Sequence, residues 1–338
     1  MKKTIISVLE IIIYMTVGIY LISHITYVVR QDDVEKKCMM GFYAEPKNSL
    51  DVVMIGGSGL RASIIPTKIY KDYGIKSYMM VTSIQRPAAI PYFMEEALKY
   101  QPNALYIIDI TNCHYTPETW GKQNEGAERH ITDTLRYSVT RVKAIFDDEI
   151  VAPENNKIDY IFDITKYHTN TDNFKYEFAW NYSKYNDNKG YLVLDGVSCQ
   201  TVNAQSDVEW DISSLKKILE FCKNAGINPI FTISFNGYGF SGESYTEVSD
   251  IIREYGYSLL AFNDIESDIM IDYGRDFYDV EHLNAYGSEK ATCILEQYLI
   301  AERNEIIKEP NDQKWLESAQ KVEQDLSEAR KTIDSALD

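Results

Sequence analysis

The sequence has few cysteines, and none of them are closely paired. The five, Cys38, Cys113, Cys199, Cys222 and Cys293, are scattered over 338 residues without a CxxC pair. This spacing favours neither a zinc site nor a dense disulfide framework. The odd count leaves at least one free thiol or an intermolecular disulfide, and the sequence alone leaves both open. No cluster of His, Asp and Cys has ligand spacing, so we expect no metal and no cofactor.

Positive charge is also scarce. The chain carries 34 Lys and Arg against 51 Asp and Glu, which gives a formal net charge of −17. Binding to nucleic acid depends on clustered Lys and Arg that neutralise phosphates. The charge balance therefore argues against a nucleic-acid partner.

A long apolar run occupies the N-terminus. Residues Ile5–Val29 contain one formal charge, Glu10, and exceed the roughly 20 apolar residues that cross a bilayer. Lys2 and Lys3 precede the run, so the positive-inside rule places the N-terminus in the cytoplasm. We therefore expect residues 1–30 to form a single-pass membrane anchor, with the C-terminal domain outside the cytoplasm. A cleavable signal peptide is the alternative.

Beyond the anchor, the pattern predicts an α/β domain over residues 51–304. Residues 31–50 read as a polar linker, and short apolar runs then alternate with amphipathic segments. This alternation is typical of a mostly parallel sheet covered by helices. The expected strands are Val52–Ile55, Ser77–Val81, Ala104–Ile110, Pro229–Ser234 and Tyr257–Phe262. The expected helices lie over residues 66–72, 87–100, 215–222 and 284–300.

Two further segments stand outside this alternation. Residues 113–211 form a long insertion, rich in Tyr, Asn and Asp, with a helix expected around residues 128–145. Such an insertion follows the carboxyl end of a strand, where ligands bind in open α/β sheets, so we interpret it as a cap. Residues 305–338 form a C-terminal amphipathic helix, whose apolar stripe is either a heptad seam or a face packed on the domain.

A glycine-flanked serine follows the first expected strand. Ser58 lies in Gly56-Gly57-Ser58-Gly59, where a strand leads into a helix, so it would face the crevice at the carboxyl edge of the sheet. Backbone N–H groups of Ser58 and Gly59 at that turn could stabilise an oxyanion. A phosphate-binding turn is the alternative interpretation of the same residues.

An aspartate precedes a histidine by three residues near the other end of the domain. Asp279 and His282 would lie in one loop just before the last helix of the domain. A serine hydroxyl becomes a nucleophile when an imidazole takes its proton and a carboxylate orients that imidazole. Ser58, His282 and Asp279 together therefore predict serine-hydrolase chemistry.

These motifs resemble the SGNH/GDSL hydrolase superfamily. Three segments look more closely like membrane-anchored, DltD-like proteins of Gram-positive bacteria: GGSGLRASIIPTKIYKDYGIKSYMM, TSIQRPAAIPYFMEEALKYQPNALYIID and FYDVEHLNAYGSEKAT. KYHTNTDNF and KGYLV resemble elements of that group's insertion. The resemblance implies a flavodoxin-like three-layer α/β/α sandwich with a parallel five-stranded sheet. It also implies that Ser58 is the nucleophile, His282 the general base and Asp279 the orienting acid.

The resemblance also indicates where an oxyanion hole would lie. Members of the superfamily usually add a Gly after the second strand and an Asn after the third. Here Ser83 and Gln85 stand nearest to the first position and Asn112 to the second, with a turn-forming Asn as the alternative. His168, in the insertion, is a candidate for binding substrate, and a structural polar role is its alternative.

The sequence thus predicts an extracytoplasmic, membrane-anchored serine esterase or O-acyltransferase that acts on acyl esters of a cell-envelope glycan or polymer. The family context implies a membrane-bound O-acyltransferase as a partner. A non-catalytic accessory protein, which binds a polymer or such an acyltransferase, is the alternative from another functional class. A phosphate-binding flavodoxin-like domain is a third interpretation, which an extracytoplasmic location disfavours.

Overall fold

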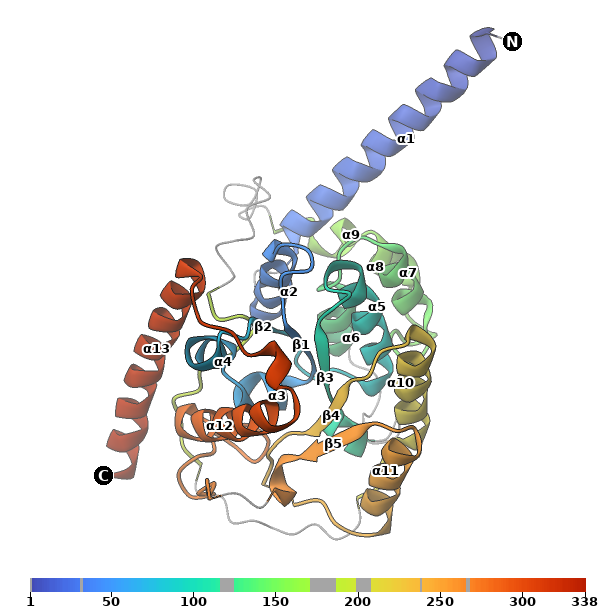
Figure 1. The fold of residues 1–338 in the computed structure, drawn as a ribbon. Coiled ribbons are helices and arrows are strands. Elements are labelled where there is room, and N and C mark those ends of the chain that lie inside the picture. The colour runs from blue at the N-terminus through green and yellow to red at the C-terminus, as the bar shows by residue number, and fades with distance from the viewer. Residues whose placement is uncertain are drawn as a thin grey trace.

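A parallel sheet of five strands forms the centre of the computed structural model (Figure 1). The strand order is β2-β1-β3-β4-β5, and each neighbouring pair is parallel. The expected α/β fold with a parallel five-stranded sheet is confirmed. The structure describes residues 2–30, 33–115, 125–170, 187–198, 208–237, 239–265 and 268–338. The strands are β1 (Val52–Gly56), β2 (Ser77–Val81), β3 (Leu105–Asp109), β4 (Ile230–Ile233) and β5 (Ser258–Ala261).

Helices cover both faces of the sheet, which explains why the central strands are apolar on both sides. Every residue of β1, β2 and β4 is buried. One layer contains α3 (Ser58–Ser63), α4 (Pro66–Tyr73) and α12 (Ala285–Glu302), and α12 contacts both of the others. The opposite layer contains α5 (Ile90–Tyr100), α10 (Ile212–Ala225) and α11 (Glu243–Glu254). Short 3-10 helices are η1 (Pro87–Ala89), η2 (Thr111–His114), η5 (Phe262–Asp264) and η6 (Asn304–Ile306).

The segment expected to be a polar linker contains a packed helix. Helix α2 (Val34–Ala44) begins with Asp33, whose side chain accepts a hydrogen bond from the Lys36 amide. Its apolar face lies on β2, where the Tyr78 hydroxyl donates to the Cys38 carbonyl and Phe42 packs edge-on against the Tyr78 ring. Residues 31–50 therefore contain a packed helix rather than a polar linker alone: Glu35 is paired with Arg61, and most apolar residues of the helix are buried.

The described part of the insertion is a set of short helices. They are α6 (Glu125–Thr132), α7 (Val139–Phe146), α8 (Lys157–Ile161) and α9 (Ile164–Tyr167). The single helix expected around residues 128–145 is therefore two helices, and Ser138 caps the second by accepting from the Arg141 amide. Helix α7 contacts α5, and α9 contacts the N-terminal helix. Residues 116–124, 171–186 and 199–207 of the predicted cap lie outside the described residues.

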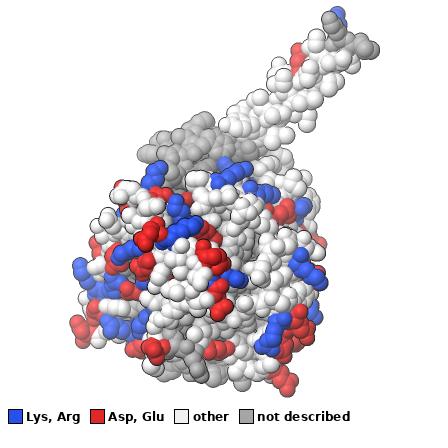
Figure 2. Space-filling model, viewed as in Figure 1, with Lys and Arg blue, Asp and Glu red and all other residues white. Residues whose placement is uncertain are grey.

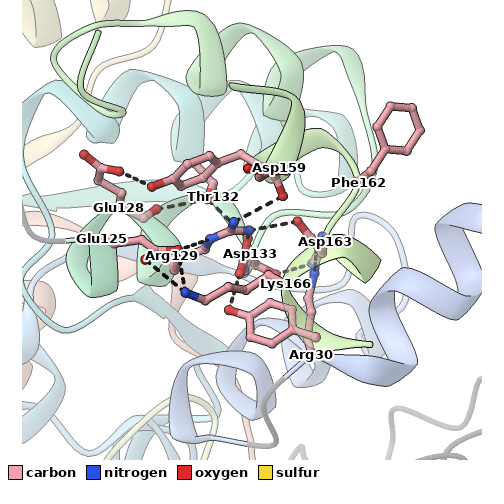
Figure 3. A network of polar contacts seen from close by, with 12 residues as sticks. Arg30, Glu125, Glu128, Arg129, Thr132, Asp133, Asp159, Phe162, Asp163 and Lys166 are labelled. Carbon is pink, nitrogen blue, oxygen red and sulfur yellow. Dashed lines mark hydrogen bonds and ion pairs between the residues drawn. The ribbon is translucent and has the colours of Figure 1, made fainter. Parts of the chain in front are cut away.

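The N-terminal helix α1 (Lys2–Val29) projects from the domain (Figure 1). Its segment Lys3–Ile22 has a mean hydropathy of 2.3 and is long and apolar enough to cross a membrane. Its end is held by a buried network of charges (Figure 3). Arg30 donates to the Asp163 carboxylate at 2.5 Å and to the carbonyl of Asp133, and Arg141 donates to the same carboxylate. The helix is thus joined to the insertion by buried contacts.

The C-terminal helix α13 (Gln313–Leu337) packs on the domain rather than standing free. It contacts α4 and α12, and the Trp315 ring lies 5.1 Å from the Tyr70 ring. This contact favours the packed amphipathic helix over a free heptad seam. The buried stripe is Trp315, Ala319, Val322, Leu326, Ala329 and Ile333.

Replacing Phe42 in α2 tests whether this helix belongs to the folded domain. Phe42 is fully buried, whereas Val34 on the same helix is exposed. We expect Phe42→Ala to lower the free energy of unfolding by about 3–5 kcal/mol, because it leaves a cavity under the aromatic rings. Val34→Ala should change it little. Denaturant unfolding of the purified protein measures both, and equal stability of the two variants would contradict the packing of α2.

Candidate active site

The candidate nucleophile begins a helix at the carboxyl edge of the sheet. Strand β1 ends at Gly56, Gly57 has an extended backbone, and half-buried Ser58 is the first residue of α3. A Cβ at Gly56 would lie 2.6 Å from the Asp109 Cβ, and one at Gly57 would lie 2.5 Å from the Asn112 amide nitrogen. Both positions therefore require glycine, because β3 and the segment after it approach too closely for a side chain.

The structure brings Ser58, His282 and Asp279 together across 224 residues of sequence. The Ser58 Oγ lies 2.8 Å from His282 Nε2. On the other side of the imidazole ring, His282 Nδ1 lies 2.8 Å from one Asp279 carboxylate oxygen and 3.0 Å from the other. With the Nδ1–H group donating to Asp279, the unprotonated Nε2 can accept the serine proton. This is the arrangement that activates a serine hydroxyl.

Backbone hydrogen bonds keep Asp279 charged and oriented. The backbone N–H groups of Glu281 and His282 donate to the carboxylate oxygen that also accepts from the imidazole. Partial burial opposes ionisation of Asp279, but the hydrogen bond from the His282 imidazole, followed by those from the backbone amides, outweighs it and holds the pKa of the carboxyl below its usual range. The residue therefore acts as a fixed negative charge that selects the imidazole tautomer.

The loop that carries the histidine is fixed at both ends. Phe277 and Leu283 form a bridge across its base, and the Gly237 amide, just after β4, donates to the Val280 carbonyl at 2.7 Å. Asn284 caps α12 by accepting from two backbone amides. The loop thus holds His282 over α3 because α12 and α3 belong to the same helix layer.

Asn112 lies at the predicted oxyanion position, but its amide already has a partner. It is part of η2, directly after β3, and its amide nitrogen contacts Gly57 as described above. That nitrogen donates to the Gln85 carbonyl at 2.8 Å. The amide has two N–H groups, so one further hydrogen bond is open to it. The backbone N–H groups of Ser58 and Gly59 start α3, where the first amides have no intrahelical acceptor.

Gln85 is placed next to Asn112, and its side chain is buried. Its side-chain oxygen accepts from the Thr82 amide at 3.2 Å. Its side-chain nitrogen has no hydrogen-bond partner among the described residues and is shielded from solvent. Gln85 therefore contacts the site through its backbone carbonyl oxygen, which orients Asn112.

His168 lies apart from the other candidates. It follows α9, beside the end of α1, and its exposed ring bonds to the Thr165 carbonyl at 3.0 Å. No contact of the described structure joins it to Ser58 or His282. Its predicted substrate-binding role thus has no geometric support at this site.

Sequence reasoning missed two contacts around the site. Glu281, which lies between Asp279 and His282, accepts a hydrogen bond from the Tyr115 hydroxyl and so ties the histidine loop to the end of η2. Asp109, the last residue of β3, is fully buried and accepts from Ser234 and Thr111 through both side chains and backbone amides. The role of Asp109 could have been predicted, because a charged residue at the end of an apolar strand is unusual. The sequence gives no comparable indication for Tyr115.

The described residues contain no cluster of three or more His, Cys, Asp and Glu placed to hold a metal ion. Within the same residues, Cys38, Cys113, Cys222 and Cys293 are free thiols, and Cys199 lies outside them. Neither protein-family models, curated proteins nor solved structures give a match to this chain. The functional argument therefore depends on the site geometry.

The buried Asp109 gives a pH-dependent prediction. Burial raises the pKa of its carboxyl, although hydrogen bonds from Ser234 and Thr111 partly offset it. The folded state thus binds the proton more tightly than the unfolded chain, whose Asp pKa is about 3.9. The stabilisation is complete below that pH and is lost as pH rises through the folded pKa.

We therefore expect wild type to lose stability relative to Asp109→Asn as pH rises from about 4 to 7. Denaturant unfolding at each pH gives this difference. Asp325→Asn, at an exposed position of α13, controls for the loss of one negative charge. Parallel stability curves for wild type and Asp109→Asn would contradict the raised pKa.

Proposed function

We propose that this protein is an SGNH-type serine esterase or O-acyltransferase that acts on acyl esters of a cell-envelope glycan or polymer. The observation that carries the proposal is the continuous hydrogen-bond chain from Ser58 through His282 to Asp279. The strand order, which is that of flavodoxin-like folds, and the position of Ser58 directly after β1 are consistent with the superfamily that the motifs resemble.

The proposed reaction is a two-step acyl transfer. The Ser58 Oγ attacks the ester carbonyl while its proton passes to His282 Nε2, and the backbone amides at the start of α3 stabilise the oxyanion with Asn112. His282 then donates that proton to the leaving alkoxide, which leaves an acyl group on Ser58. Water or a sugar hydroxyl attacks this ester, again losing its proton to His282. Collapse of the second intermediate returns the proton to Ser58.

The exposure of the site suits a large substrate. The Asp279 side chain is 44% exposed and that of His282 is 21% exposed. A polymer ester can reach such a site without entering a deep cavity. Water as the acceptor makes the protein an esterase and a sugar hydroxyl makes it a transferase, so the two are forms of one proposal.

We further propose that α1 is retained as a membrane anchor. The apolar side chains between Ile5 and Ile22 are 41–76% exposed on all sides of the helix, which suits lipid better than water. Val28 and Val29 are buried in the domain, and Arg30 binds Asp163. Cleavage of a signal sequence within this region would remove part of a packed segment, which supports an anchor. A membrane-bound O-acyltransferase is a partner that such an anchor would place nearby.

A non-catalytic accessory role is the second candidate. One observation favours it: one of the two N–H groups of the Asn112 amide is already bonded to the Gln85 carbonyl. In this role the domain would bind a polymer or a membrane-bound O-acyltransferase without forming an acyl-enzyme. Reactivity of Ser58 distinguishes the two candidates.

Fluorophosphonate labelling tests the catalytic proposal directly. We expect the full-length protein in detergent to be labelled, because the probe reacts with a serine that an imidazole activates. Ser58→Ala and His282→Ala should both abolish labelling. Ser63→Ala, on the same short helix, is the matched control and should be labelled like wild type. Absence of labelling in wild type would reject the catalytic proposal in favour of the accessory role.

The length of the mature chain tests the anchor proposal. We expect protein purified from membranes of the expressing cell to have the intact mass of residues 1–338, apart from N-terminal processing at Met1. A charge-removing variant, Arg30→Met, should keep this mass but lower the free energy of unfolding by about 3–5 kcal/mol, because it leaves buried Asp163 with fewer cations. A mass that lacks residues of α1 would identify a signal sequence instead.

A further inference from the structure

A buried ion pair connects the segment after the membrane helix to the helix that carries Ser58. Glu35, in the first turn of α2, forms two hydrogen bonds with the guanidinium of Arg61 on α3. Their side chains are 3% and 1% exposed, respectively. Arg61 lies three residues after Ser58 and also donates to the Val81 carbonyl at the end of β2, at 2.7 Å. The pair thus fixes α3 against both α2 and β2.

The same carboxylate holds the turn that orients Asn112. One oxygen of Glu35 accepts from the Ser83 amide at 3.1 Å and from the Ser83 hydroxyl. Two residues further on, the Gln85 carbonyl accepts from the Asn112 amide. Glu35 therefore contacts both arms of the candidate site, the helix of the nucleophile and the turn behind the predicted oxyanion donor.

This turn needs external support because its backbone is strained. Ile84, between Ser83 and Gln85, has a φ of 53°, in the left-handed region that β-branched residues rarely adopt. Such a conformation is unfavourable and persists only where surrounding contacts enforce it. Glu35 on one side and Asn112 on the other supply those contacts.

Stability alone does not explain the pair. Burial opposes the charge on Glu35, and Arg61 outweighs it, so that the pKa of the carboxyl is lowered. Buried ion pairs are often no more stabilising than apolar residues of similar size, because desolvation offsets the attraction. The pair instead fixes a geometry, because two parallel hydrogen bonds between the Arg61 guanidinium and the Glu35 carboxylate set the relative orientation of the two side chains.

We propose that Glu35 is a positioning residue that sets the reactivity of Ser58 by holding α3 and the Ser83–Gln85 turn in register. This inference rests on the proposed function. Only residues 30–33 separate α1 from α2, and Arg30 and Asp33 at their ends are fixed by Asp163 and by the Lys36 amide. We therefore expect the position of α1 to affect the position of Glu35 and, through Glu35, the geometry of the candidate site.

Kinetics of fluorophosphonate labelling test the proposal in the full-length protein in detergent. We expect Glu35→Gln to lower the maximal labelling rate about 10- to 100-fold with little change in probe affinity, because a displacement of about 1 Å at reacting groups is that costly. Ser83→Ala removes one hydroxyl contact to Glu35 and should lower the same rate by a smaller factor. It serves as the milder variant if Glu35→Gln folds poorly.

Glu45→Gln is the matched control. Glu45 ends the same helix and is also buried in an ion pair, with Lys189 Nζ 3.0 Å from its carboxylate, but this pair contacts neither Ser83 nor Arg61. We expect its labelling rate to equal that of wild type when each protein is measured equally far below its own melting midpoint. An equal loss in Glu45→Gln, or no loss in Glu35→Gln, would overturn the proposal.

Hydrogen–deuterium exchange separates this proposal from the proposed function. We expect faster exchange in α3 and in residues 82–86 of Glu35→Gln, but not of Glu45→Gln, whether or not Ser58 reacts. If wild type is not labelled but this exchange pattern appears, the positioning of the two arms holds and the catalytic proposal fails. If wild type is labelled and exchange in these segments is unchanged by Glu35→Gln, the positioning role is wrong.

Discussion

The chain that follows β1 crosses one face of the sheet, and the chain that follows β3 crosses the other. This topology creates a crevice between the two strand ends, and the candidate site lies there. Ser58 follows the first of these strands and Asn112 follows the second, so they meet although they are far apart in sequence. Gly56 and Gly57 let the two strand ends approach, and Asp109 fills the space beneath them with a buried carboxylate. The histidine loop completes the site because α12 packs beside α3 in one helix layer.

Buried carboxylates cross-link segments of the domain, both within the sheet and between helices. Asp109 links β3 to Thr232 of β4 and to Ser234 just after it through hydroxyl and amide donors alone. Glu35 and Arg61 link α2 to α3, and Arg30 and Asp163 link the end of α1 to the insertion. Each carboxylate has several defined donors, which limits the arrangements of its neighbours. Apolar packing would hold the same elements together but would tolerate small displacements, to which a reacting serine is sensitive.

The sequence predicted the sheet well because fully buried parallel strands are read directly from apolar runs such as Val52–Ile55. It also predicted which residues meet: the order of strand, Ser58 and helix at one end and Asp279-x-x-His282 at the other led to the observed hydrogen bonds. It failed over α2, because apolar residues interspersed with Glu35 and Lys36 resemble a polar linker until their partners are known. The contact between the Gln85 carbonyl and the Asn112 amide could not be predicted, because a sequence does not show which backbone carbonyl a side chain will reach.

Whether the site is catalytic or only structural depends on how much its hydrogen bonds contribute to the stability of the fold. Hydrogen bonds and ion pairs between partly exposed side chains contribute about 0–1 kcal/mol to the free energy of unfolding. The contact of His282 with Asp279 therefore stabilises the fold little. The buried groups beneath, Asp109 above all, already hold the loops in place. A partly exposed imidazole with an oriented carboxylate on one nitrogen and a serine hydroxyl on the other is therefore better explained by proton transfer than by stability. On that reasoning the bond from Asn112 to the Gln85 carbonyl marks an orienting contact within the site rather than the loss of a catalytic donor, because the second N–H group of the amide is still available for an oxyanion.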